Sequence, residues 1–336
     1  MGLFKDVNVD IDVLKPSGAV TSTNVLLVVE KVGGFAYKEY SGEDALLAIE
    51  SDFAKTTNAY ELANAVLKQK NRPEKVAIVG YDPTGGDVAD VVEANFVADW
   101  YYVVLESADT ADQIAVTQVL DDANNKIAVL RVNDVADAAV LEAAGIQRAY
   151  VLYTPVVDEF IDAAFVGEYA ADEAGSATAK FKQLAGITPS ELSIVDYNAL
   201  QDVNASAYVK KFGEAQTTGS KLLGGDFLDV VAGNDWVIAT LEQRVQAIYL
   251  KNRKVVYEQA GANLIGSEVE AVMKLAIDRD IIAEDLEGNG LFSVTIPNVQ
   301  DMTEADRASR KLKGIKFAYQ LAGAIEEVDI KGQVSF

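Results

Sequence analysis

The chain has 336 residues, of which 50% are hydrophobic, and a formal net charge of −23 from 52 acidic and 29 basic residues. This length and apolarity suffice for sizeable cores, and the negative charge argues against nucleic acid or an anionic membrane as a partner. Cysteine and histidine are absent, which excludes disulfides, Cys/His zinc sites and nucleophiles activated by a histidine base. Without a leader pattern or a long apolar run, we expect a soluble protein made in a cytoplasm and no membrane contact.

The first predicted element is a two-faced strand near the N-terminus. Branched apolar residues alternate with Asp and Asn, which places them on opposite pleat faces. The apolar positions are Val7, Val9, Ile11 and Val13. A LKPSG break at residues 14–18 follows, and we therefore interpret residues 1–20 as an extended N-terminal arm.

Short apolar runs then alternate with helical stretches. KVAIVGYD, WYYVVLES, KIAVLRVN and RAYVLYTP are rich in Val, Ile and Tyr, and the intervals between them have helix-like patterns. Strand and helix repeated on this spacing predict a mixed α/β fold with a helix-covered sheet core. We assign residues 21–155 to this α/β domain.

The second half predicts another α/β unit, a C-terminal domain over residues 156–323. Its expected elements are a helix in EFIDAAFVGEYAADEAG, a hairpin in AYVKKFGEAQTTGSKLLGG, a long helix capped by Asn234 or Asp235, and a helix beginning at Ser267. The strands LFSVTIP and IKFAYQL then flank a short helix in DMTEADRASRKLKG.

Residues 324–336 alternate as the N-terminal segment does. The apolar positions are Val328, Ile330, Val334 and Phe336. Terminal residues fray unless they are tied down, so this pattern implies a sheet that receives the strand. Strands usually pair within their own chain, and the alternation alone does not say whose sheet it is.

The candidate chemical motifs are weak. GYDPTGGDVADV leads from a strand into a helix, where anions bind, but it lacks the Lys-Ser/Thr of a P-loop, and Asp82 and Asp87 repel phosphate. An ordinary turn is favoured. DLEGNG begins like a calcium loop, yet Ile296 stands where the bidentate Glu is needed. We therefore assign no catalytic residue, cofactor or metal.

One basic run stands out from the acidic background. Arg307, Arg310, Lys311, Lys313 and Lys316 occur with no acidic residue between them. In a helix, Ala305, Ala308, Leu312 and Ile315 would form an apolar stripe with the cations opposite. This run fits either charge complementation at a helix C-terminus or a docking surface for an acidic partner.

The C-terminal run DRASRKLKGIKFAYQLAGAIEEVDIKGQVSF closely resembles the end of contractile tail sheath proteins of myovirus-type phages and related contractile injection systems. GSATAKFKQLAGITPSELS and DVNASAYVKKFGEAQTTGSKLLGGDFLDVVAGNDWV resemble middle segments of the same family. The resemblance covers most of the chain and is strongest from about Trp100 onward.

The resemblance implies a structural role rather than an enzyme. Sheath subunits of this family form hexameric rings stacked in a helical polymer around an inner tail tube protein, and contraction drives the tube through a target envelope. Terminal arms complete the β-sheets of neighbouring subunits, with hinges expected at residues 14–18 and Gly323. Baseplate and tail terminator proteins are the implied partners at the two ends. The expected location is a virion tail or phage-tail-like particle assembled in the host cytoplasm.

The resemblance also implies a role for the basic run. Arg307, Arg310, Lys311 and Lys313 are expected to face the inner tube. Two alternatives stay open: a nucleotide-binding enzyme on the α/β core, for which GYDPTGGD is the best signal, and a non-contractile homo-oligomeric shell.

Overall fold

The computed structural model describes residues 24–331. The predicted N-terminal arm, with Val7, Val9, Ile11 and Val13, lies outside the described residues. So do the last two apolar positions of the C-terminal arm, Val334 and Phe336.

Eight strands form one sheet in the order β2-β3-β1-β4-β5-β6-β7-β8. The inner strands pair in parallel, and the two edge strands pair antiparallel. The bounds are β1 (Val25–Glu30), β2 (Phe35–Ser41), β3 (Lys75–Tyr81), β4 (Tyr102–Leu105), β5 (Ile127–Val132), β6 (Ala149–Tyr153), β7 (Ser206–Lys211) and β8 (Glu214–Thr217). The predicted mixed α/β fold and the predicted hairpin, β7 with β8, are confirmed.

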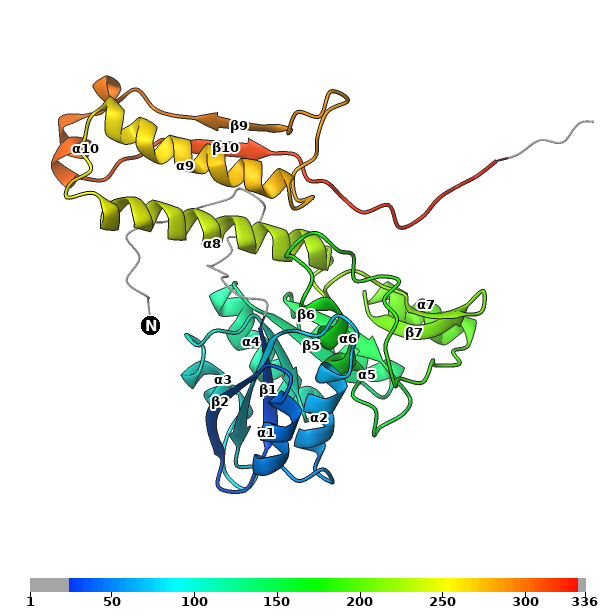
Figure 1. Cartoon of the computed structure of the whole chain (residues 1–336). Helices are drawn as coiled ribbons and strands as arrows, with labels where there is room; N and C mark the ends of the chain where they lie inside the picture. Colours follow the sequence, from blue (N-terminus) through cyan, green and yellow to red (C-terminus); the bar gives the residue numbers. More distant parts are fainter. Residues whose placement is uncertain (1–23, 332–336) are drawn as a thin grey trace, which may run out of the picture.

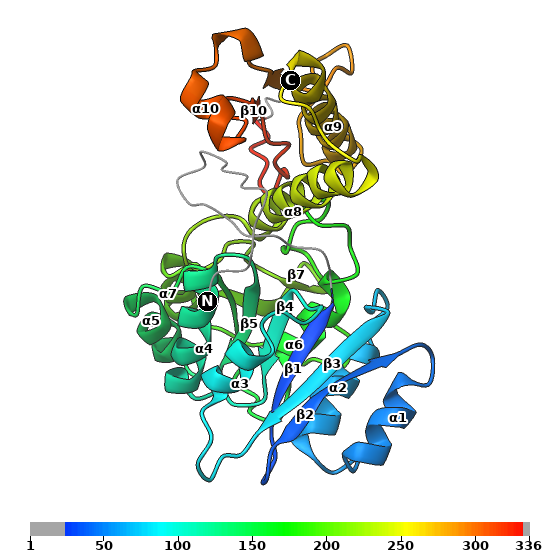
Figure 2. The same ribbon diagram turned by 90° about the vertical axis from the view of Figure 1, so that its left-hand side faces the viewer.

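Helices cover both faces of this sheet (Figure 2), which explains why its inner strands are almost continuously apolar. One face packs on α1 (Ala45–Asp52), α2 (Asn58–Leu67) and α6 (Ile161–Tyr169). The other packs on α3 (Val88–Ala94), α4 (Thr110–Ala123), α5 (Val135–Ala143) and α7 (Ile194–Asp202). Asp87, Asp109 and Asp134 each accept a hydrogen bond from a backbone N–H two residues on, which fixes the starts of α3, α4 and α5.

Two long helices and a two-stranded ribbon make up the C-terminal part (Figure 1). Their order is α8 (Leu228–Lys251), α9 (Gln259–Ile277), β9 (Phe292–Thr295), the 3-10 helix η1 (Val299–Asp301), α10 (Glu304–Ser309) and β10 (Lys316–Tyr319). Side chains of α8, α9 and the ribbon share one apolar cluster that includes Val237, Val269 and Met273.

Both long helices begin earlier than the sequence predicts. Asn234 and Asp235 do not cap α8, which begins at Leu228, and Ser267 lies inside α9, which begins at Gln259. Asn234 and Asp235 have tertiary partners instead of capping a helix. The hydroxyl of Ser267 donates to the carbonyl of Asn263 one turn back, 2.9 Å away.

Consecutive residues of α8 connect it to both parts of the molecule. Asp235 is fully buried and forms an ion pair with Arg148, which precedes β6, and its carboxylate accepts a 2.8 Å hydrogen bond from Tyr101. Asn234 accepts a 2.6 Å hydrogen bond from the hydroxyl of Tyr319 in β10. The first half of α8 is therefore fixed to the sheet on one side and to the ribbon on the other.

Candidate assembly interfaces

The β9–β10 ribbon has two unlike faces, and among the described residues isolated bridges, Ile282 with Leu321 and Glu284 with Gly290, continue just past its strands. Its register pairs Lys316 with Thr295 and Tyr319 with Phe292. One face packs on the α8–α9 core through Phe292, Val294, Phe317 and Tyr319, and the other is exposed. Among the described residues, each strand has only the other as a ladder partner. Backbone N–H and C=O groups along the sides of β9 and β10 that have no ladder partner are the groups with which an added strand pairs.

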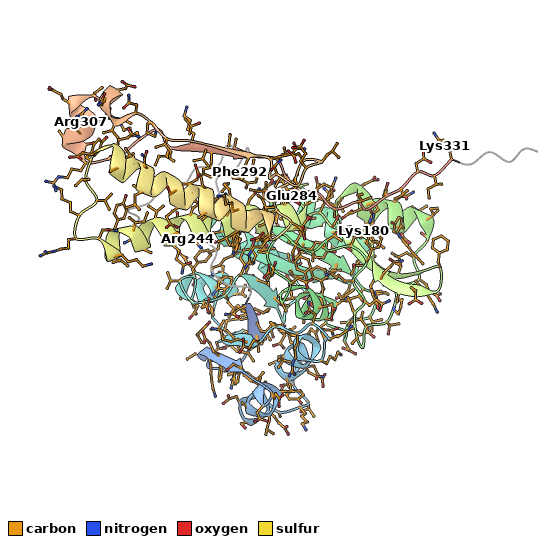
Figure 3. The ribbon with its side chains drawn as sticks, turned by 45° about the horizontal axis from the view of Figure 1, so that its top comes forward. Lys180, Arg244, Glu284, Phe292, Arg307 and Lys331 are labelled. Atoms are coloured by element: carbon orange, nitrogen blue, oxygen red, sulfur yellow. The ribbon has the colours of Figure 1, made fainter. Side chains whose placement is uncertain are left out.

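The chain leaves this ribbon as a segment without regular structure. Residues 322–331 belong to no helix or strand, and the segment runs away from the C-terminal part (Figures 1 and 3, where Lys331 is labelled). Ile325, Val328 and Ile330 are 83%, 73% and 85% exposed. Within residues 24–331 the predicted terminal strand pairs with no sheet, and its role as an exchanged arm stays a prediction.

One residue ties this segment to the α/β domain. The carboxylate of Glu326 accepts hydrogen bonds from the hydroxyls of Thr178 and Ser220 at 2.6 and 2.8 Å, and Lys180 lies 3.7 Å away. The Glu326 side chain is only 16% exposed. Sequence reasoning missed this contact, because its donors are more than 100 residues away along the chain.

The basic run is not one helix. α10 ends at Ser309, and Arg310 has a left-handed conformation with φ of 56°. The predicted apolar stripe is therefore wrong in its first half, because Ala305 and Ala308 are exposed. Its second half is used differently, since Leu312 and Ile315 pack from an irregular segment against Val245, Ile248 and Ile265.

The predicted tube-contact residues fall into two pairs. Arg307 donates to the carbonyl oxygen of Val299 at 3.0 Å. Lys313 forms a 2.7 Å ion pair with Asp306, whose hydrogen bond raises the pKa of the lysine. Among the described residues, Arg310 and Lys311 have no acidic partner and are exposed. Arg310 and Lys311 are thus the members of the set that are free for another molecule.

The two motif turns use their polar groups internally. Asp82 accepts hydrogen bonds from the hydroxyl and N–H of Thr84 and the N–H of Gly33, and the first of these contributes most to its lowered pKa. Asp285 accepts from the N–H groups of Glu287 and Asn289 in the DLEGNG turn. Both sequences therefore form turns stabilised by an aspartate side chain.

Carboxylates lie where doubly wound sheets usually bind ligands. Strand order reverses between β1 and β4, and at their carboxyl ends Glu106 accepts a 2.9 Å hydrogen bond from the N–H of Glu30. Tyr81 donates to the Glu30 carboxylate at 3.1 Å, and burial raises the pKa of Glu106. Ionised carboxylates there disfavour a phosphate. In residues 24–331 no group of three or more acidic side chains is arranged to hold a metal, and no helix is long and apolar enough to span a membrane.

Comparisons with known proteins identify the class to which this architecture belongs. Residues 228–334 match the family described as E217 tail sheath protein gp31-like, C-terminal domain. No curated protein matches the chain in a sequence comparison. The fold is that of contractile sheath proteins, and the resemblance predicted from the sequence is confirmed.

Two of the similar solved structures cover nearly the whole chain. The helical sheath of the anti-feeding prophage in its contracted state matches with a TM-score of 0.71 at 13% identity, over 99% of each chain. The contracted sheath complex of an extracellular contractile injection system, PVC, matches at 0.69 and 12%, over 99% of this chain and 98% of that one. A sheath tail protein from Desulfitobacterium hafniense matches at 0.58 and 12%, over 88% and 93%.

Proposed function

We propose that this chain is the structural subunit of a contractile tail sheath. It polymerises as stacked hexameric rings around an inner tube, and contraction drives the tube through a target envelope. The observation that carries this proposal is the end-to-end match to a contracted helical sheath together with the sheath-family match of the C-terminal part. The work comes from relaxation of a metastable lattice, so the subunit needs no catalytic residue or cofactor.

The domains that serve this function divide the chain differently from the expected boundary at residues 155 and 156. β7 and β8 continue the sheet, and the family match begins with α8. We therefore take the α/β domain to extend to the loop before Leu228 and the C-terminal sheath domain to comprise α8 through β10. Residues 1–20 and the segment from 324 onward serve as arms.

The arms join subunits by adding strands to neighbouring ribbons. The sides of β9 and β10 that have no ladder partner among the described residues and the exposed Ile325, Val328 and Ile330 support this exchange. Burying four apolar side chains gains roughly 6–12 kcal/mol, while ordering about seven residues costs roughly 7–14 kcal/mol. The net free energy of docking one arm is thus close to zero. Two arms per subunit in a closed lattice stabilise the assembly by avidity.

Arg310 and Lys311 face the inner tube, and Arg307 and Lys313 hold the segment that presents them. Exposed ion pairs contribute about 0–1 kcal/mol each, which suits a contact that guides assembly and then releases. The baseplate and a terminator cap the two ends of the polymer, and a similar chain in the baseplate structure of the anti-feeding prophage supports the first of these. The assembled sheath belongs to a virion tail or tail-like particle built in the host cytoplasm.

Electron microscopy of the concentrated subunit tests the proposal. Wild-type protein should form striated tubes or six-fold rings, and discrete particles under all assembly conditions would contradict it. A chain lacking residues 327–336 keeps Glu326 and the body, and it should remain monomeric. If the truncated chain still formed sleeves, the C-terminal arm would not be the connector.

A paired variant tests the tube contact. Arg310→Glu with Lys311→Glu should abolish co-sedimentation with preformed inner tubes while leaving the subunit folded. Replacing Lys313 by Gln, which removes a cation that Asp306 already neutralises, should change binding much less. Undiminished binding by the charge-reversed protein would remove these residues from the contact.

A further inference from the structure

A second basic segment lies at the turn between the two long helices. Lys251 ends α8, and Arg253 and Lys254 follow in the loop to α9. All three are exposed, and none has an acidic partner within the described residues. The turn lies at the end of the C-terminal domain that projects beyond the α/β domain (Figure 1). Sequence reasoning passed over this KNRK run.

The turn is packed against the other basic segment. The hydroxyl of Tyr257 donates to the carbonyl of Lys311 at 3.2 Å. Val255 and Leu312 pack on the same apolar cluster, which includes Val245 and Ile248. Two segments more than 50 residues apart in sequence therefore form one surface, which we call the basic tip. The basic tip comprises Lys251, Arg253, Lys254, Arg310, Lys311, Lys313 and Lys316. Figure 3 labels Arg307 beside it.

The charge of the basic tip contrasts with that of the whole chain. Residues 251–254 and 310–316 hold seven of the 29 basic residues and no carboxylate. The remaining residues then carry 29 − 7 = 22 basic against 52 acidic side chains, a balance of 22 − 52 = −30. Within the tip, only Lys313 has an ion pair among the described residues. The other six cations have no ion pair within residues 24–331, and their concentration on an acidic protein indicates a surface for an acidic ligand.

We infer that the α8–α9 turn is a second half of the tube-docking surface and binds an acidic face of the inner tube through Lys251, Arg253 and Lys254. The inference rests on the proposed sheath function. The tip projects away from the α/β domain, whereas the C-terminal arm departs beside Lys180 on that domain. A ring around a tube turns one end of each subunit toward the axis, and we assign the tip to that end because its cations match an acidic tube surface.

The tip also offers an apolar contact. Leu250, next to the cations, is 80% exposed, and Leu264 on α9 is 41% exposed. Ionic contacts weaken as salt rises, whereas apolar burial does not. The matching tube surface therefore combines carboxylates with an apolar recess, and part of the binding should persist at high salt.

The test uses the full chain and inner tubes purified from the same particle. Lys251→Glu, Arg253→Glu and Lys254→Glu together should reduce co-sedimentation with tubes at least tenfold at about 0.15 M salt. Lys70→Glu, Lys210→Glu and Lys274→Glu form the matched control, since these exposed lysines lie elsewhere and give the same change in net charge. Equal urea midpoints for both variants establish that the subunits are folded.

The outcomes separate this inference from the function on which it rests. If the tip variant retained tube binding as the control variant does, the inference would be wrong. If both variants lost tube binding to the same extent, the loss would reflect net charge alone, and the inference would again be wrong. If the tip variant failed to form sleeves in the absence of tubes, the basic tip would bind a second copy of this chain. That result would also overturn the inference. If wild-type protein neither forms sleeves nor binds tubes, the proposed function itself fails.

Discussion

The hydroxyl of Thr178 donates a 2.6 Å hydrogen bond to the carboxylate of Glu326, 148 residues later in the chain. With Ser220 as a second donor, this contact fixes the point at which the C-terminal segment leaves the body. If this segment acts as an arm, we therefore expect it to hinge after Glu326 rather than at Gly323, where the sheath resemblance suggested a hinge. The backbone from β10 to Glu326 is held at both ends.

Replacing Glu326 by Ala should loosen the root of the arm. Hydrogen bonds to a charged group contribute about 1.5–3 kcal/mol each, so amide exchange in residues 322–328 should accelerate roughly tenfold or more. Hydrogen exchange followed by mass spectrometry measures this directly. Glu327→Ala is the control, because Glu327 is 91% exposed and its one ion pair among residues 24–331 is with Lys180, at 3.7 Å. Equal exchange in the two variants would show that Glu326 does not hold the segment.

Replacing Asp235 by Ala should destabilise the whole subunit. Removing one partner of a buried ion pair costs about 3–5 kcal/mol, and here it leaves the guanidinium of Arg148 without its carboxylate. Urea unfolding followed by circular dichroism measures the loss. Arg148→Met with Asp235→Leu should recover much of the stability, because no buried charge remains. A double variant as unstable as the single one would assign the loss to packing.

Lys126 gives stability a pH dependence. Burial lowers the pKa of Lys126 to about 7, and its ammonium lies 3.8 Å from the ring centre of Trp100. An unfolded lysine keeps its proton to about pH 10. Between about pH 7 and pH 10 the unfolded state therefore binds more protons, so the free energy of unfolding contributed by this group rises with pH.

Comparison with Lys126→Met isolates the effect. The difference in urea midpoint between wild type and variant should shift in favour of wild type as pH increases from about 7 to about 9. If the difference in urea midpoint stayed constant over this pH range, the pKa of Lys126 in the folded protein would lie outside the range.

Gly167 marks the closest approach of two helices. A Cβ there would lie 2.8 Å from the Cα of Val66 in α2 and closer still to its carbonyl oxygen. Gly167→Ala should therefore cost about 1–3 kcal/mol, because the α2–α6 contact must open. Gly85→Ala is the control, since a Cβ at that position would meet nothing within 4 Å, and it should change the thermal midpoint little. Equal midpoints would mean that the helices shift freely.

Local patterns predicted the centre of the fold well. The apolar runs around Ile78, Val104, Val129 and Val151 became β3 to β6, because burial on both faces leaves little choice of residue. The hairpin around Gly213 was predicted by its turn, where φ is 96°. These features depend on neighbours in sequence, so sequence alone reveals them.

Several features could not be predicted from the sequence, most of them because they depend on contacts between distant residues. Asp235 has the residue type of a helix cap, but its partner is Arg148 in another element. Arg310 ends α10 in a left-handed conformation that its residue type does not indicate. Glu326 has an ordinary polar side chain until Thr178 and Ser220 lie beside it. The KNRK run was visible in the sequence, but only the nearby hydrogen bond from Tyr257 to Lys311 shows that it lies next to the second basic segment.

The separation of the basic tip from an otherwise acidic body makes the subunit an electric dipole. A negatively charged cylinder attracts the tip and repels the rest, so a diffusing subunit is turned before any atoms touch. Direct contacts determine how long a subunit stays bound to the tube, whereas this alignment raises the rate at which subunits associate with it. Assembly around a tube should therefore slow with added salt even where the finished sleeve is insensitive to it.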